Sequence, residues 1–142
     1  MREQMFELIR RQRSCVLATT LDDRPHCSLM GYLADPEAGR IHLVTLPGTR
    51  KYRNIQANPH CSLLIDDRGG ADRGRTRALT VEGRCTTVSD GERAAILARR
   101  LEAAHPHLAG LLHHPDRVIL EVAVRRLILL DGPEDAYVET FS

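Results

Sequence analysis

The sequence predicts a single domain of the α+β class, mainly β, in which six antiparallel strands curl into a barrel with flanking helices. Three observations support this prediction. The chain has 142 residues, which is the length of one ordinary domain. Six segments have the apolar and β-branched composition of strands, and short turn-rich links between them favour antiparallel pairing. Helical patterns occur at the ends of the chain and in one crossing.

The N-terminal part reads as a helix followed by three strands. Apolar residues of segment 2–12 form one stripe with charges opposite, so an amphipathic helix that covers the sheet is predicted. Strands are predicted at 15–21, 26–33 and 40–46, because apolar residues alternate or cluster there and turn-forming residues separate the runs. These three strands are expected to form a hairpin and then a meander.

A short helix and two longer strands follow. Thr49 is a suitable N-cap, and Asn58-Pro59 ends the helical pattern after about two turns. Strands are predicted at 60–65 and 77–88, and Gly83 indicates a bend or bulge in the second of them. The middle of the chain therefore places a capped helix between two hydrophobic strands.

The remaining segments are a loop, a helix and the closing strands. Residues 66–76 are polar and glycine-rich, so we expect an exposed and mobile loop. Ser89 or Asp90 is expected to cap a helix that ends near His105, followed by a short helical or turn segment. One or two strands are predicted within 118–130, and the last dozen residues are expected to be a small extra strand or a tail.

The composition argues against several classes of partner. A formal net charge of +1 creates no overall field that would attract nucleic acid or an anionic membrane. No window approaches the ~18 apolar residues of a membrane span, and the charged N-terminal segment is unlike a secretory signal. The expected compartment is therefore the cytoplasm. The four cysteines lack the CxxC spacing of a zinc or dithiol site, so core positions are expected for Cys15, Cys27, Cys61 and Cys85.

One local pattern indicates an anion site. Lys51 is the only lysine among the 20 basic residues, and it follows Thr49 and Arg50 at the start of the short helix. A helix N-terminus favours anions through its unpaired N–H groups and its dipole. Arginine can bind a phosphate through two parallel hydrogen bonds, and lysine adds a mobile charge. The alternative is a helix start that carries two solvated bases.

The order of motifs in this region resembles that of the pyridoxamine 5′-phosphate oxidase-like family of flavin-binding split-barrel proteins. The resemblance covers about residues 15–88 well and the rest only in general layout. It implies a six-stranded antiparallel split β-barrel spanning residues 1–142 as one FMN-binding domain. The matching elements are Leu17-Ala18-Thr19, Arg24-Pro25, Thr45, Thr49-Arg50-Lys51, Asn54, Asn58-Pro59 and Ser62-Leu63-Leu64.

At the phosphate end of the cofactor, the resemblance assigns roles to four residues. It implies that Arg50 and Lys51 hold the flavin 5′-phosphate, with Thr49 and the helix N–H groups beside them. It also implies that Thr45 approaches the ribityl chain or the ring. A deazaflavin is the alternative cofactor, because relatives that use it share a lysine and an asparagine at the positions of Lys51 and Asn54.

At the ring end, the resemblance implies contacts from two chains. The second strand would present backbone to the pyrimidine side of the isoalloxazine at Ser28, Leu29 and Met30. Arg77, or its neighbour Ala78, would reach the cofactor across a two-fold interface. A homodimer with cofactor sites at the subunit interface is therefore expected.

The chain also departs from the oxidase of vitamin B6 metabolism. Ser28 stands where that enzyme has a phosphate-binding arginine, and the chain lacks tryptophan and the closing substrate-binding segment. Oxidation of pyridoxamine 5′-phosphate is therefore not expected.

Three functional classes remain open. The first is a flavin-dependent oxidoreductase acting on an unidentified small molecule or electron donor, without an essential acid or base from the chain. The second is a flavin-binding protein without turnover. The third is a haem-binding relative, for which four clustered histidines are candidate ligands, although a polar loop explains them without a metal: His105, His107, His113 and His114.

Overall fold

The computed structural model describes residues 1–68, 75–133 and 135–141. Its helices are α1 (Arg2–Arg11), α2 (Arg50–Ala57), α3 (Gly91–Ala104), the 3₁₀ helix η1 (Pro106–Leu108) and α4 (Ala109–Leu112). Its strands are β1 (Ser14–Leu21), β2 (Arg24–Gly31), β3 (Leu33–Asp35), β4 (Arg40–Thr45), β5 (His60–Asp66), β6 (Arg77–Thr87), β7 (Val118–Asp131) and β8 (Asp135–Thr140).

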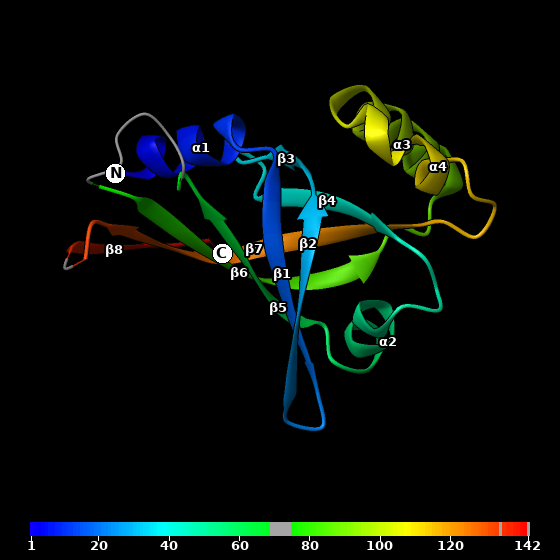
Figure 1. The fold of residues 1–142 in the computed structure, drawn as a ribbon, viewed down its shortest axis with the longest axis horizontal. Helices are drawn as coiled ribbons and strands as arrows, with labels where there is room; N and C mark the ends of the chain where they lie inside the picture. Colours follow the sequence, from blue (N-terminus) through cyan, green and yellow to red (C-terminus); the bar gives the residue numbers. More distant parts are fainter. Residues whose placement is uncertain (69–74, 134, 142) are drawn as a thin grey trace.

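The eight strands of the described residues form one antiparallel sheet in the order β2-β1-β5-β6-β7-β4-β3, with β8 beside β7. The sheet twists and curls into a half-barrel, with α1 near one end and α3 and α4 near the other (Figure 1). This confirms the predicted α+β, mainly β class. The strand number is eight instead of six because residues 33–35 and 135–140 add two short strands.

The third predicted strand pairs differently from the expected meander. β4 lies between β7 and the short β3, and it does not pair with β2. The chain leaves β2 through Tyr32, a buried residue whose hydroxyl donates to the Ile9 carbonyl of α1 at 2.5 Å. β2 and β3 follow each other in sequence but lie at opposite edges of the sheet, so the chain passes at Tyr32 from one edge to the other.

Residues from all layers fill the main core. α1 contributes four buried residues, and the inner faces of β1, β4, β5, β6 and β7 contribute most of the others, together with Met30, Tyr32 and Ile55. Gly83 marks the bulge that the sequence indicated, where the register between β6 and β7 shifts. A Cβ at Gly83 would meet the Ala123 carbonyl oxygen at 2.7 Å, so only glycine lets the two strands approach there.

A second, smaller core lies on the other face of β4. Val44 and Ile119 pack there against apolar residues of α3 and α4, among them Leu101 and Leu112. Asp90 caps α3 by accepting from two backbone N–H groups, which decides between the two predicted caps. This packing places α4 beside the C-terminal end of β4.

The cysteines divide into two groups. Cys15, Cys61 and Cys85 are buried as predicted, and burial raises the pKa of the Cys15 thiol to about 12, which keeps it protonated. Cys27 is exposed, so its predicted core position is wrong. It falls on the outward face of the edge strand β2, opposite Ala18.

Two remaining expectations concern parts at or beyond the limits of the described chain. Most of the predicted loop over 66–76, namely residues 69–74, lies outside the described residues. The C-terminal segment forms the extra strand that was one of two expectations.

Among the described residues, the helices are too short or too polar to cross a membrane.

Candidate functional site

A cleft opens where the ends of β2 and β4, the start of α2 and the η1–α4 segment meet. Its volume is about 210 Å³. Five of the eight residues assigned to a cofactor from the sequence line it: Leu29, Met30, Thr45, Thr49 and Lys51. The remaining lining comes from Gly31, Val44, Leu46, Leu108 and Leu111.

The floor of the cleft is a hydrogen-bonded turn between β4 and α2. Thr49 caps α2, since its hydroxyl accepts from the Tyr52 N–H at 3.4 Å, which confirms the predicted N-cap. The same hydroxyl donates to the Leu46 carbonyl at 2.9 Å and lies 3.0 Å from the Thr45 hydroxyl. Thr45 is 2% exposed. These bonds fix the helix start against the strand end, while the first N–H groups of the helix lack partners within it.

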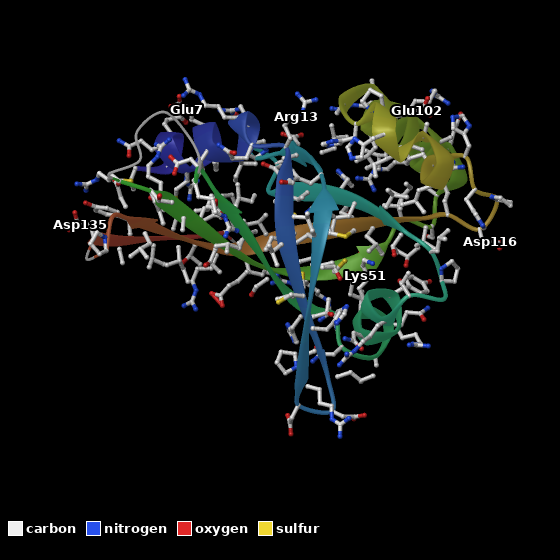
Figure 2. All side chains as sticks on the ribbon, in the orientation of Figure 1. Glu7, Arg13, Lys51, Glu102, Asp116 and Asp135 are labelled. Atoms are coloured by element: carbon white, nitrogen blue, oxygen red, sulfur yellow. The ribbon has the colours of Figure 1, made fainter. Side chains whose placement is uncertain are left out.

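Lys51 and Arg50 line different cavities, although they are neighbours in sequence. Lys51 lines the cleft, and Figure 2 shows it on the side of α2 that faces the strands. Arg50 lines a separate hollow of about 500 Å³ beside the β1–β2 hairpin. Successive residues of an α-helix point about 100° apart, so adjacent side chains do not face each other. The two cations therefore flank the helix start instead of projecting together.

Asn54 locks α2 onto the sheet. It is 2% exposed, and its side-chain amide donates to the Thr19 hydroxyl on β1 at 3.1 Å. It also lines the hollow that contains Arg50, one helical turn away on the same face. The buried asparagine of the sequence motif thus has a structural role, because it holds the helix start in place relative to the hairpin.

Ser28 and Arg77 do not line the cleft of their own chain. Ser28 is half-buried opposite Leu17 on the inward face of β2. Arg77 donates to Asp67 from its Nε at 3.1 Å, and it pairs with the C-terminal end of β7, whereas Thr45 pairs with the N-terminal end. The contact of Arg77 with a cofactor across a two-fold interface stays a prediction.

Sequence reasoning missed the apolar wall opposite α2. Leu108 and Leu111 of the η1–α4 segment line the cleft together with Met30 and Lys51. Their spacing of three residues is typical of one helical face, and this pattern in the sequence could have indicated the apolar wall. Leu29, at the rim, is 78% exposed, the largest exposure among the large apolar residues of the described chain.

The four clustered histidines do not converge on one point. His105 is 4% exposed, its Nε2 lies 2.8 Å from the Tyr32 carbonyl oxygen, and its ring packs against Gly31. His113 pairs with Glu102, and His114 accepts from a backbone N–H through Nδ1. Within residues 1–68, 75–133 and 135–141, no three histidine, cysteine or acidic side chains form a group that could hold a metal.

A second polar cluster, unforeseen from the sequence, lies beneath α3. Glu121 of β7 accepts from His42 Nε2 at 2.9 Å and pairs with Arg93 of α3, while Arg40 lies 3.6 Å away. Burial favours a raised pKa for the Glu121 carboxyl, but the hydrogen bonds from Arg93 and His42 outweigh it and lower that pKa. Burial lowers the pKa of His42, which keeps the imidazole neutral. This group, the Glu121 cluster, joins α3 to the sheet.

Comparisons with known proteins agree with the fold. The family model of pyridoxamine 5′-phosphate oxidase matches residues 1–131. A comparison with curated proteins gives no match. General Stress Protein 26 from Bacillus anthracis has a TM-score of 0.78 at 20% identity, over 99% of this chain and 98% of that one. A FAD-binding protein from Mesorhizobium loti has a TM-score of 0.77 at 18% identity, over 94% and 95%.

A third similar structure is longer than this chain. It is a heme binding protein from Mycobacterium smegmatis, with a TM-score of 0.84 at 19% identity, and the match covers 98% of this chain but 57% of that one. Such identities show a shared fold. Because the family model spans most of the chain and the curled antiparallel sheet agrees with it, the chain belongs to the pyridoxamine 5′-phosphate oxidase-like family of split-barrel proteins.

Proposed function

We propose that the chain binds FMN in the cleft beside α2 and acts as a flavin-dependent oxidoreductase on a small molecule. One observation carries the proposal: residues assigned to the cofactor from three separate sequence segments line one cleft, next to a capped helix start. These segments contribute Leu29 and Met30, then Thr45, then Thr49 and Lys51.

The donor set of the cleft fits a flavin mononucleotide. Its polar end carries the lysine ammonium and the free N–H groups of α2, which suit a phosphate, while the hydroxyls of Thr45 and Thr49 hold the turn beside it. Its other walls are apolar, with Leu29, Met30, Leu108 and Leu111 available to a flat ring. A bound isoalloxazine would supply hydride or electron transfer. The chain itself would position the phosphate on Lys51 and the N–H groups at the start of α2, with the charge of Arg50 on the other flank of the helix start, and would shield the ring from water.

The size of the cleft favours a site completed by a second copy of the chain. A volume of about 210 Å³ is below the roughly 300–1,000 Å³ of ordinary ligand pockets. A partner subunit that covers the rim would enlarge the enclosed space and bury Leu29. The same arrangement would bring Arg77 of one chain toward the cofactor of the other.

The outward face of the sheet offers an apolar surface for that second copy. Residues directly opposite each other in neighbouring strands share a face of the sheet. One such row crosses the sheet from β2 to β8, and five of its six members are apolar: Leu29, Val16, Leu64, Thr80, Ile128 and Val138. Val138 is 57% exposed. We call this set the outer row and propose that it packs against a partner subunit, because its ends at Leu29 and Val138 are exposed and its middle is half-buried and mostly apolar, which favours association.

A haem is the weaker candidate ligand, although one similar structure is a heme binding protein. The lining of the cleft, within the described residues, includes no histidine or cysteine that could ligate iron. A deazaflavin is compatible with the same walls, because Lys51 and Asn54 keep the positions that the resemblance associates with it. The cofactor experiment separates these three.

The proposal is tested by the visible absorption spectrum of the purified protein, with mass spectrometry of the molecule released by heat. Two broad bands and released FMN are the expected result. A single band between those positions with a released deazaflavin, or a sharp intense band with released haem, would replace FMN by that cofactor. Protein that is colourless and takes up no added FMN would refute the proposal.

The proposed dimer is tested with one substitution on the outer row. Val138→Arg places a charge in the expected interface, so we expect a monomer by light scattering and weaker retention of FMN. Ile96→Arg is the matched control, since Ile96 is 47% exposed on α3, outside the outer row. A monomeric wild type, or a dimer unaffected by Val138→Arg, would contradict this interface.

A further inference from the structure

A large cavity lies on the outward face of the sheet and shares no lining residue with the cleft. Its volume is about 630 Å³, within the roughly 300–1,000 Å³ of ordinary ligand pockets. Its floor is a row of residues that pair directly across five strands, two positions along each strand from the outer row: Ala18, Ser62, Glu82, Arg126 and Thr140. We call this cavity the outer hollow.

Small residues produce the outer hollow. Side chains stand roughly perpendicular to a sheet, so a small residue between larger ones leaves a depression. Ala18 and Ser62 are such residues, and their neighbours on the same face of β1 and β5 are larger: Val16, Thr20, His60 and Leu64. Gly83, which has no side chain, also lines the depression. The hollow is therefore a consequence of the strand sequences.

A β-bulge in β7 places two consecutive arginines at the outer hollow. Side chains of a strand normally alternate between its two faces. In β7, however, the buried positions run to Val124 and resume at Leu127. The ladder with β6 shifts register at Gly83, which leaves Arg125 without a paired residue there. Arg125 and Arg126 are therefore both exposed, and both line the hollow, as is typical of bulges that re-aim a side chain.

Backbone hydrogen bonds hold the bulge in place. The Arg125 carbonyl accepts from the Phe141 N–H at 2.7 Å, and the Val124 N–H donates to the Gly39 carbonyl at 2.9 Å. The base of the Arg125 side chain is thus fixed between β7 and the C-terminal segment. A group presented from a fixed position loses less conformational entropy when it binds a ligand.

The charges of the outer hollow leave one cation without a partner. Arg126 pairs with Glu82, which is the only acidic residue of the lining. Arg125 forms no ion pair with any residue that the structure describes. The lining also offers three hydroxyl groups, from Thr20, Ser62 and Thr140. A ligand that carries one negative charge would balance the site.

We infer that the outer hollow binds an organic carboxylate that has an apolar body. The guanidinium group of Arg125 can donate two parallel hydrogen bonds to the carboxylate. The apolar body has matching surface in the side chains of Ala18, Pro25 and Phe141. One chain supplies all of these groups, and none of them belongs to the cleft, so the inference goes beyond the proposed function and does not depend on it.

The test uses benzoate as the probe, with benzamide as its uncharged isostere and acetate as a carboxylate without an apolar body. A ¹H–¹⁵N NMR titration of the protein as purified follows the backbone signals of Ser62, Gly83 and Phe141. We expect benzoate at millimolar concentration to shift these signals, and benzamide and acetate to shift them much less.

Substitution of Arg125 tests the charged contact. Arg125→Gln should weaken benzoate binding by about tenfold, the lower end of the scale for a charge-assisted contact, because the hollow is open to solvent. Arg125→Lys should restore part of the loss. Arg99→Gln is the matched control, because Arg99 is an exposed arginine of α3 outside the hollow.

Each contrary result has its own appearance. Unshifted signals at all three positions, or equal shifts with benzamide, would overturn the inference. Benzoate affinity that is unchanged in Arg125→Gln would also overturn it, and so would shifts confined to Leu108 and Leu111, since these residues line the cleft. A protein that binds no flavin but binds benzoate in this way would refute only the proposed function. Circular dichroism melting of each variant shows whether the fold is intact.

Discussion

Two groups of basic residues in this chain look alike in composition and differ in whether their side chains form ion pairs with a carboxylate. In the Glu121 cluster, three basic side chains converge on one carboxylate. Around the start of α2, Arg24, Arg50 and Lys51 form no ion pair within the described residues. The difference indicates that the first group stabilises the fold, whereas the second is available for a ligand.

Burial agrees with this division. The side chains of His42 and Glu121 are 7% and 18% exposed, so their charges and hydrogen bonds are partly removed from water and must be satisfied within the protein. Arg24 and Arg50 are exposed and lose little by remaining unpaired in water. Substitutions should therefore separate stability from cofactor binding.

The largest effect is expected at the start of α2. The double variant Arg50→Ala/Lys51→Ala should weaken FMN binding by about 3–6 kcal/mol, since two charge-assisted contacts of roughly 1.5–3 kcal/mol each are lost. The denaturation midpoint should change little, because neither side chain has an ion-pair partner within the described residues. Equilibrium titration and urea denaturation measure the two quantities. Unchanged flavin retention would refute the assignment of both residues.

An intermediate effect, on stability instead of FMN binding, is expected in the Glu121 cluster. Glu121→Gln keeps the shape of the side chain but removes the charge that pairs with Arg93 and accepts from His42, so we expect a loss of about 2 kcal/mol in the free energy of unfolding. FMN affinity should stay within twofold of the wild type. A variant as stable as the wild type would show that the cluster contributes nothing to folding.

The smallest effect is a pH dependence of the free energy of unfolding, and it comes from the same cluster. Burial lowers the pKa of His42 below its ordinary value of 6.5, and the hydrogen bond to Glu121 offsets this only in part. The unfolded chain therefore takes up a proton at a higher pH than the folded chain does. The stability associated with neutral His42 is fully present above about pH 6.5 and is lost as the pH falls toward the pKa of His42 in the folded chain.

Urea denaturation at pH 7.5 and at pH 5.5 measures this dependence. The wild type should lose more stability between these values than His42→Gln, which lacks the titrating group. Because the pKa of Glu121 is also lowered from its ordinary value of 4.5, a further loss is expected below that pH in both proteins. Identical pH profiles for the wild type and His42→Gln would exclude His42 as the source.

Much of the local structure could be predicted because it depends on neighbouring residues. The capped start of α2 at Thr49, the hairpin of β1 and β2 and the bulge at Gly83 all follow from residues a few positions apart. The ordered motifs of segment 15–88 were enough to indicate the family. The exposed Cys27 was mistaken for a core residue, since composition does not tell which face of an edge strand meets solvent.

The cleft could be predicted only in part. Its lining from β2, β4 and α2 was anticipated through the family resemblance, but the wall of Leu108 and Leu111 was not, because it depends on where α3 and α4 pack. The pairing of β4 with β7 was also missed. Pairing of strands distant in sequence is decided by the register and curl of the whole sheet.

The sequence by itself determined the strands, the capped helix start and the basic residues at that start, because hydrogen bonding and hydrophobic periodicity act over short distances along the chain. The tertiary structure decided how those parts meet. It placed Lys51 in the cleft and Arg50 beside Arg24, on opposite flanks of one helix, and it enclosed Glu121 among three basic side chains. Such contacts join residues far apart in sequence, so they exist only once the sheet has curled and the helices have packed upon it.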